Sequence, residues 1–188
     1  CSSLVSVDVS GFDTSNVISM RWMFSGCSSL ASVDVSGFDT SNITYMEWIF
    51  NGCSSLEGVD VSGFDTKNVT SIENMFRGCS SLVSVDVSGF DTRNVTKMSG
   101  MFSSCSSLKN LDLSSFDVGK VIENQFLSDL FYNCDSLSEI QTPQNVNVAS
   151  LLPTRAGTVW LIPDGTEVTE LPQNLSYSVK LTRHYTKG

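Results

Sequence analysis

Cysteine recurs along this chain at one fixed interval. Five cysteines lie 26 residues apart, and nearly the same phrase, CSSL-x-x-VDVSGFDT-x-N-V-x-x-M, follows each of them. A fixed period of about 20 to 50 residues is typical of stacked repeats, in which each unit packs only against its neighbours. The sequence therefore predicts a solenoid. It also argues against an enzyme, because near-identical units offer no place for a unique set of catalytic residues. The five cysteines are Cys1, Cys27, Cys53, Cys79 and Cys105.

The pattern within one repeat predicts a strand followed by a short helix. Apolar and polar residues alternate over residues 4–9, which is typical of a strand with one buried face. Phe12 should then point inward, and apolar residues recur every three or four positions over residues 17–24, as on the buried face of a helix. We expect an α/β repeat: a leucine-rich-repeat solenoid with parallel strands on the concave face, short helices on the convex face and a small β-rich C-terminal cap. The leucines expected in its core are Leu4, Leu30, Leu56, Leu82 and Leu108.

The repeated phrase also resembles a named family. The unit CSSL-x-x-VDVSGFDTSNV-x-x-M-x-x-MF is similar to the 26-residue repeat of bacterial surface proteins, a branch of the BspA-like leucine-rich repeats, over about residues 1–140. The resemblance implies a secreted or cell-surface bacterial protein, with adhesion to host or neighbouring cells as the usual role. A fold does not by itself fix a function.

The register breaks in the fifth unit. Cys134 lies 29 residues after Cys105, and the extra residues, within 122–130, predict a longer helix there. A sixth strand should begin near Leu137 and end before Pro143, since proline cannot donate to a sheet. We therefore divide the chain into a repeat region, residues 1–143, and residues 144–188, which form either a C-terminal β cap or a separate small β module. Strands are expected there at 158–162, 166–168 and 175–185.

The six cysteines are expected to be buried free thiols. Each stands at the same place in its repeat, so the side chains lie in a row, with poor geometry for disulfide bonds. The chain has no Cys-x-x-Cys pair and only one histidine, His184, so we expect no metal site and no cofactor.

One column of aspartates is predicted to face solvent on the concave sheet. It is either a stripe that binds cations or cationic ligands, or a solvated face. Neighbouring carboxylates repel one another, so we expect raised folded pKa values at Asp60 and Asp86, which have a carboxylate on both sides. A second column, which starts at Asp13, fits turn hydrogen bonds. The first column comprises Asp8, Asp34, Asp60, Asp86 and Asp112.

The outer face of the predicted helices varies from unit to unit. Arg21 and Trp22 in the first repeat correspond to Glu47 and Trp48 in the second. The two tryptophans should lie one above the other. They either hold a sugar or a protein partner, or they pack over the helices as part of the outer wall. We name these four residues as candidate ligand-binding residues.

The net charge and the hydropathy of the chain narrow the classes of partner. A formal net charge of −9 argues against nucleic acid as a partner, and no apolar run is long enough to insert into a membrane. The leading hypothesis is a non-catalytic, extracellular binding or adhesion module that contacts a host or bacterial surface protein, a glycan or a neighbouring cell. The alternative is a passive spacer that projects another domain from the cell wall. Because the chain begins within the repeat register, we also expect repeats or domains upstream of Cys1.

Overall fold

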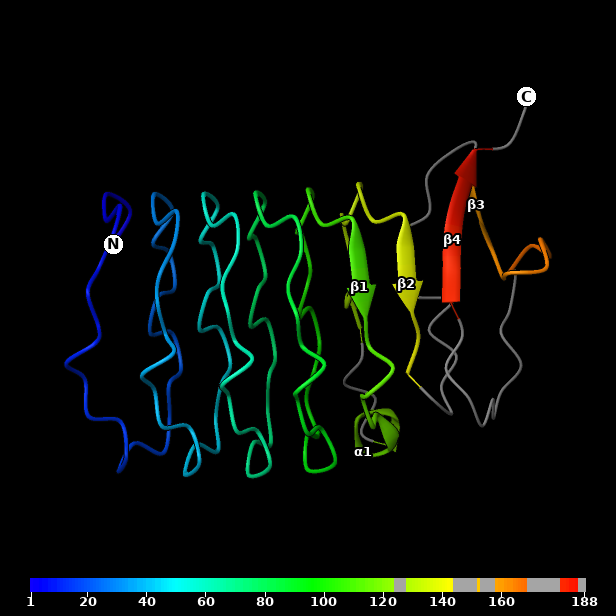
Figure 1. Cartoon of the computed structure of the whole chain (residues 1–188). Coiled ribbons are helices and arrows are strands. Elements are labelled where there is room, and N and C mark those ends of the chain that lie inside the picture. Colours follow the sequence, from blue (N-terminus) through cyan, green and yellow to red (C-terminus); the bar gives the residue numbers. More distant parts are fainter. Residues whose placement is uncertain (124–127, 144–151, 153–157, 169–179, 186–188) are drawn as a thin grey trace.

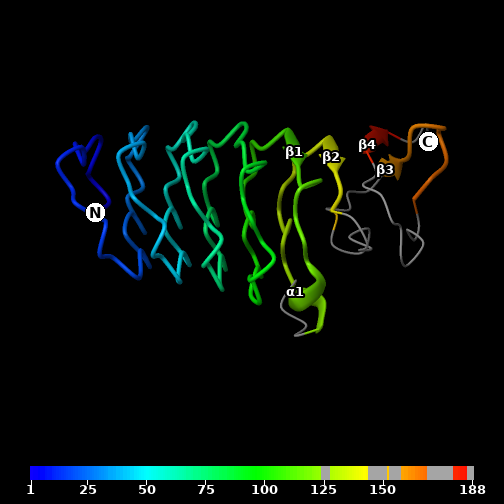
Figure 2. The same ribbon diagram turned by 60° about the horizontal axis from the view of Figure 1, so that its bottom comes forward.

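The repeats lie side by side as a row of coils. The computed structural model describes residues 1–123, 128–143, 152, 158–168 and 180–185. The N-terminal coil stands at one end of the row and the C-terminal strands at the other (Figure 1). A second view, turned by 60°, shows the same order (Figure 2). Each interior coil therefore has one neighbour on either side.

Tight turns form most of each coil. Backbone N–H groups at the corners donate to the carbonyl oxygen three residues earlier, which is the hydrogen bond of a β-turn. Because these turns recur at the same places in successive units, the coils share one shape and can stack. In the second coil the bonds run from Phe38 to Val35, from Ile43 to Thr40 and from Asn51 to Trp48, over 3.0 to 3.2 Å.

The expected convex helices are not formed, so the α/β leucine-rich-repeat solenoid is the wrong fold class. In the described part of the chain the single α-helix is α1 (Gly119–Glu123), five residues long, in the fifth unit. Backbone φ is +58° at Trp22 and +73° at Gly26, a left-handed conformation that a right-handed helix does not contain. The N–H of Phe24 donates 2.9 Å to Ile49 of the next coil, where a helix would use the carbonyl four residues back.

The expected concave strands are also missing from the first four coils. Regular pairing begins only with β1 (Asn110–Asp112), which pairs in parallel with β2 (Glu139–Gln141). The earlier coils are joined instead by isolated parallel bridges between equivalent residues. The first pairs Ser19 with Tyr45, and the same position is bridged in the next two junctions. The alternation seen at residues 4–9 nevertheless predicts burial correctly in the second coil. There, Leu30, Val33 and Val35 are all buried.

Backbone hydrogen bonds between coils take the place of helices and strands. Four N–H groups of the first coil donate to four carbonyls of the second, over 2.7 to 3.2 Å, and the same four bonds join coils two to three and three to four. In these four columns the donor always lies in the earlier coil. Three other columns run in the opposite sense, through Ala31, Thr44 and Ser55. The first four bonds run from Met20 to Tyr45, from Trp22 to Glu47, from Phe24 to Ile49 and from Gly26 to Asn51.

The core is a set of identical side chains stacked along the row. One phenylalanine from each coil joins a column with ring centroids 5.6 to 6.3 Å apart and planes within 12° of parallel. The predicted core leucines are confirmed at four places, with no exposed surface, whereas Leu4 is partly buried. The expectation for Phe12 is wrong, because it is 51% exposed in the first coil, which has no coil before it. The column comprises Phe24, Phe50, Phe76, Phe102 and Phe131.

The C-terminal strands continue the sheet that the last two coils begin. β3 (Thr158–Leu161) and β4 (Lys180–Tyr185) complete a four-stranded sheet of order β1-β2-β4-β3, in which β4 is antiparallel to both of its neighbours. These strands confirm two of the predicted ones, apart from residues 175–179, which lie outside the described residues. Residues 166–168 contribute only a bridge, from Glu167 to Leu161. The helix expected over 122–130 overlaps α1, and residues 124–127 also lie outside the described part.

Candidate functional site

Trp22 and Trp48 occupy the same place in adjacent coils, and both have left-handed backbone, with φ of +58° and +64°. Trp22 is 58% exposed and Trp48 is partly exposed. The next three coils place Asn74, Gly100 and Asp129 there, also with positive φ. These residue types tolerate the conformation, whereas a bulky side chain rarely adopts it, at a cost of roughly 1 to 2 kcal/mol. The two tryptophans therefore stand in strained backbone that other coils fill with better-suited residues.

Beside the tryptophans, Arg21 and Glu47 form an ion pair between the first and second coils. The Arg21 Nε and Nη2 atoms each donate 2.7 Å to a carboxylate oxygen of Glu47, whose side chain is only 7% exposed. The guanidinium also lies 4.1 Å from the centre of the Tyr45 ring. Burial acts to raise the pKa of Glu47, but the hydrogen bonds from Arg21, from a backbone N–H and from Ser71, together with attraction to the Arg21 charge, outweigh it, and the pKa is lowered.

The structure thus brings together Arg21 and Glu47, two of the four candidate ligand-binding residues, as an ion pair that the sequence analysis did not predict. Opposite charges at the same place in adjacent repeats were a usable signal for this pair. Tyr45, two residues before Glu47, was missed altogether. The result is a partly exposed cluster of the Arg21 guanidinium, the Glu47 carboxylate and the Tyr45 ring, directly before Trp22 in the chain.

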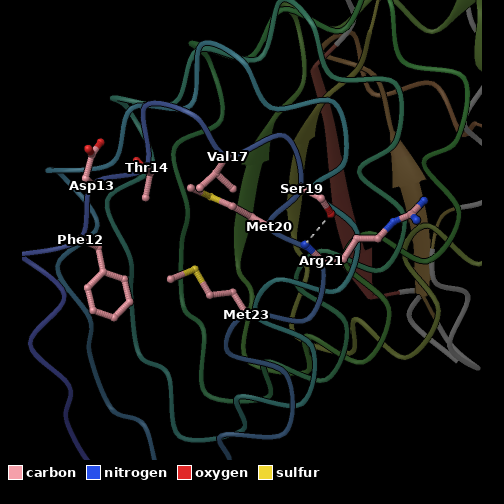
Figure 3. Close-up of a pocket in the computed structure, with 8 residues that line it drawn as sticks. All are labelled: Phe12, Asp13, Thr14, Val17, Ser19, Met20, Arg21 and Met23. Atoms are coloured by element: carbon pink, nitrogen blue, oxygen red, sulfur yellow. Dashed lines mark hydrogen bonds between the residues drawn. The ribbon is translucent and has the colours of Figure 1, made fainter.

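A hollow of about 510 Å³ opens at the N-terminal end of the row. Figure 3 shows the side chains of the first coil around it, with the Arg21 N–H donating 3.4 Å to the Ser19 hydroxyl. Apolar side chains form much of the wall. The hollow is lined by Phe12, Asp13, Thr14, Val17, Ser19, Met20, Arg21 and Met23.

The first aspartate column is held by turns within each coil. In all five residues, carboxylate Oδ1 accepts the backbone N–H of the residue two places on, over 2.8 to 2.9 Å. The serine hydroxyl and this N–H lower the pKa of Asp60 and Asp86, so the raised values expected from repulsion are wrong. A neighbouring carboxylate opposes the shift at Asp86 only as the smallest contribution. Local hydrogen bonding therefore dominates over the repulsion between exposed charges.

The second column repeats this turn and links the coils as well. Oδ1 of Asp13, like that of Asp39, accepts the N–H two residues on, over 3.0 Å, which confirms the expected turn hydrogen bonds. The Thr40 hydroxyl accepts the N–H of Asp65 (2.7 Å) and donates to the carbonyl of the same residue (3.2 Å). One small polar residue in each coil therefore satisfies both backbone groups of its neighbour.

The cysteines form a row of free thiols, of which five are buried and only Cys1 is exposed. The Cys53 Sγ donates 3.1 Å to the carbonyl of Phe24 in the preceding coil, and Cys79 does the same to Phe50. Burial raises the pKa of Cys53, and that of Cys134, to about 12. These thiols are consequently protonated and act as small core residues with a weak donor.

Other kinds of site find little support in the described residues. No three His, Cys, Asp or Glu side chains among them are grouped closely enough to hold a metal ion. His184 is exposed on β4, where its ring lies 3.1 Å from the Thr182 hydroxyl. Nor does this part of the chain contain a helix of the length and hydropathy needed to cross a bilayer.

Comparison with known proteins identifies the repeats. A family model described as "Mycoplasma protein of unknown function, DUF285" matches residues 1–84 and again residues 50–152. The two matches overlap, as expected when one repeat model fits a repeated chain in two registers. The comparison with curated proteins gave no match, and neither did the comparison with solved structures. Since the second match alone spans more than half of the 188 residues, the chain belongs to the DUF285 family.

Proposed function

We propose that this chain is a non-catalytic binding module of a cell-surface protein, with Trp22 at the centre of its contact surface. The observation that carries the proposal is the left-handed backbone under Trp22 and Trp48. Strained residues persist where the surrounding structure holds them, and they cluster at functional sites. Asn74 shows that the same place accepts a residue without this strain.

The neighbourhood of Trp22 suits a binding surface. Trp22 exposes its indole, and the residue before it, Arg21, holds its guanidinium over the Tyr45 ring, so the segment offers broad aromatic contact area at little cost in side-chain entropy. Arg21 is held at both ends of its fork by Glu47, so the cluster needs no reordering when a ligand arrives. These features favour a glycan or a protein surface as the ligand.

The extracellular location rests on the repeat itself. The 26-residue unit is similar to the BspA-like bacterial surface repeat, and the matched family, itself of unknown function, is only loosely related to such repeats. We therefore place the module outside the cell, where it contacts a host protein, a glycan or another cell.

The test replaces Trp22 by a residue that the position accepts. Trp22→Asn removes the indole and keeps a side chain that tolerates positive φ, so the free energy of unfolding should rise by about 1 kcal/mol. Binding to a panel of immobilised extracellular-matrix proteins and polysaccharides, measured by biolayer interferometry, should weaken at least about tenfold, since an aromatic anchor contributes more than 1 kcal/mol.

The matched control is Tyr132→Asn. Tyr132 is also 58% exposed, but it lies near the other end of the row, and its removal should leave binding unchanged. A protein that binds nothing in the panel, or binds equally well with Asn at position 22, would favour the spacer.

A further inference from the structure

The ion pair of Arg21 and Glu47 offers a ligand hydrogen-bond donors but no net charge. Both contacts are 2.7 Å long, and the Glu47 side chain is only 7% exposed, whereas that of Arg21 is 39% exposed. Within the described part of the chain, Nη1 of Arg21 donates to no other residue, so its two N–H groups remain for a ligand. The side chain extends away from Phe12 and Met23 (Figure 3), toward its partner in the second coil.

This internal pairing disfavours a charged ligand. A sulfate or carboxylate that took both donors of Arg21 would have to displace Glu47, and a buried carboxylate left without its partner is strongly unfavourable. The Glu47 carboxylate also cancels most of the attraction that an anion would feel at a distance. The chain carries a formal net charge of −9, which repels polyanions further. A cationic ligand meets the guanidinium instead, since Arg21 is the more exposed partner, so the ligand that fits is uncharged.

The exposed aromatic side chains near the pair belong to the first two coils. Tyr45 is 37% exposed and Trp22 is 58% exposed, and the Trp22 N–H donates 3.2 Å to the carbonyl of Glu47. In coils three and four the place of Trp22 is taken by Asn74 and Gly100, which are both buried. A protein partner needs about 800 Å² of contact on each side. A pyranose ring needs only one aromatic face for its C–H groups and a few donors for its hydroxyl groups, and this segment has both.

We propose that the ligand of this surface is an uncharged glycan, which rests on the binding role proposed above and names its ligand class. Hydroxyl groups of the sugar accept from Nη1 of Arg21, and the ring lies against an aromatic side chain of the first two coils. Glu47 supplies the selectivity, because it keeps the donors in place and removes the charge that would recruit sulfated or sialylated chains. Binding accordingly depends little on salt, in contrast to the recognition of a polyanion.

Biolayer interferometry at two salt concentrations tests this ligand class. The immobilised probes are the neutral polysaccharides dextran, mannan and galactan, and the polyanions heparin and polysialic acid. At least one neutral polysaccharide should bind the wild type, with an affinity that changes less than about twofold between about 50 and about 500 mM NaCl, and neither polyanion should bind. Binding of a polyanion by the wild type, or loss of the neutral ligand at high salt, would overturn the proposal.

Glu47→Gln removes the negative partner and should create a new affinity. Arg21 then keeps its charge without a carboxylate beside it, so heparin should bind at least about tenfold above the wild-type response in about 50 mM NaCl and be released in about 500 mM. The matched control is Glu73→Gln, which removes the same charge from the same place one coil later and leaves Arg21 paired, so heparin should still not bind. Circular dichroism verifies that both variants are folded at the measuring temperature. Equal binding of heparin by the two variants would rule out the ion pair as the source of selectivity.

The ligand class and the binding role can fail separately. If the module binds an extracellular-matrix protein in a way that Trp22→Asn weakens, and binds none of the neutral polysaccharides, the binding role stands and the uncharged glycan is wrong. If it binds neither a matrix protein nor a polysaccharide, both are wrong.

Discussion

The first and second coils share almost the same sequence, yet they differ in which side chains are buried. Phe12 and Cys1 are exposed in the first, while Phe38 and Cys27 are at most 6% exposed in the second. The difference lies entirely in the neighbours, since only the second coil has a coil on both sides. Burial in this protein is thus a property of the junction between coils and not of the residue alone.

The largest expected effect is a difference in stability between two phenylalanine substitutions, one in the exposed first coil and one in the second coil, which has neighbours on both sides. Phe50 has no exposed surface and stacks between Phe24 and Phe76 at 5.6 Å from each ring. Phe50→Ala should lower the free energy of unfolding by about 3 to 5 kcal/mol, through lost burial and a cavity. Phe12→Ala should change it by less than about 1 kcal/mol, because that ring is half exposed. Urea unfolding of both variants measures the difference, and equal losses would show that the first coil is covered in solution.

An intermediate effect concerns the ion pair that crosses the first junction. Glu47→Gln should cost about 1 to 3 kcal/mol, because a buried, charged acceptor for Arg21 is weakened. Glu73, at the same place one coil later, is only partly buried, and Glu73→Gln serves as the control with little change.

The pH dependence of the same pair has a definite sign. The folded pKa of Glu47 is lowered, so the stabilisation is complete above the unfolded value of about 4.3 and is lost as the pH falls through the lower folded value. Thermal melts at pH 7 and pH 2 should show the wild type and Glu47→Gln converging at pH 2. A difference in melting temperature that persists at pH 2 would show that the substitution acts through packing and not through the ion pair.

The smallest expected effect tests whether the stability that the aspartate turns contribute is independent of the neighbouring coils. Asp8, in the first coil, and Asp60, in the third, have pKa values lowered by the same serine hydroxyl and N–H contacts within one coil. Asp→Asn at either position should lower the melting temperature slightly, and equally, at pH 7. For a lowered folded pKa the stabilisation exists above about pH 4 and disappears on acidification, so both differences should vanish near pH 2. If Asp60→Asn raised the melting temperature and Asp8→Asn did not, repulsion between neighbouring carboxylates would be the dominant effect after all.

The repeat period and the buried positions could be predicted from the sequence, but the path of the backbone could not. Apolar spacing over residues 17–24 is the same for a helix and for a series of turns whose side chains enter one core. The distinguishing signal was Asn74, Gly100 and Asp129, which share one place and all favour left-handed backbone. Trp22 and Trp48 masked it, because tryptophan is seldom found in that conformation.

The aspartates were misread for a related reason. Repulsion between neighbouring repeats follows from the period, whereas the hydrogen bond from Ser62 to Asp60 depends on a turn that the period does not describe. The pairing of Arg21 with Glu47 needed only the two charges and the spacing of one repeat. Contacts between equivalent positions were therefore predictable from the period, whereas inside a coil the turn hydrogen bonds of the Asp13 column were predicted and those of the Asp60 column were not.

The columns of backbone hydrogen bonds also bear on how such a chain evolves. They join main-chain atoms, so they persist whether the residue after Arg21, Glu47 or Glu73 is tryptophan or asparagine. The buried side chains and the main chain determine how the coils stack, whereas the exposed side chains differ between repeats. A duplicated repeat therefore arrives with its scaffold complete, and its outer face can change without loss of the fold.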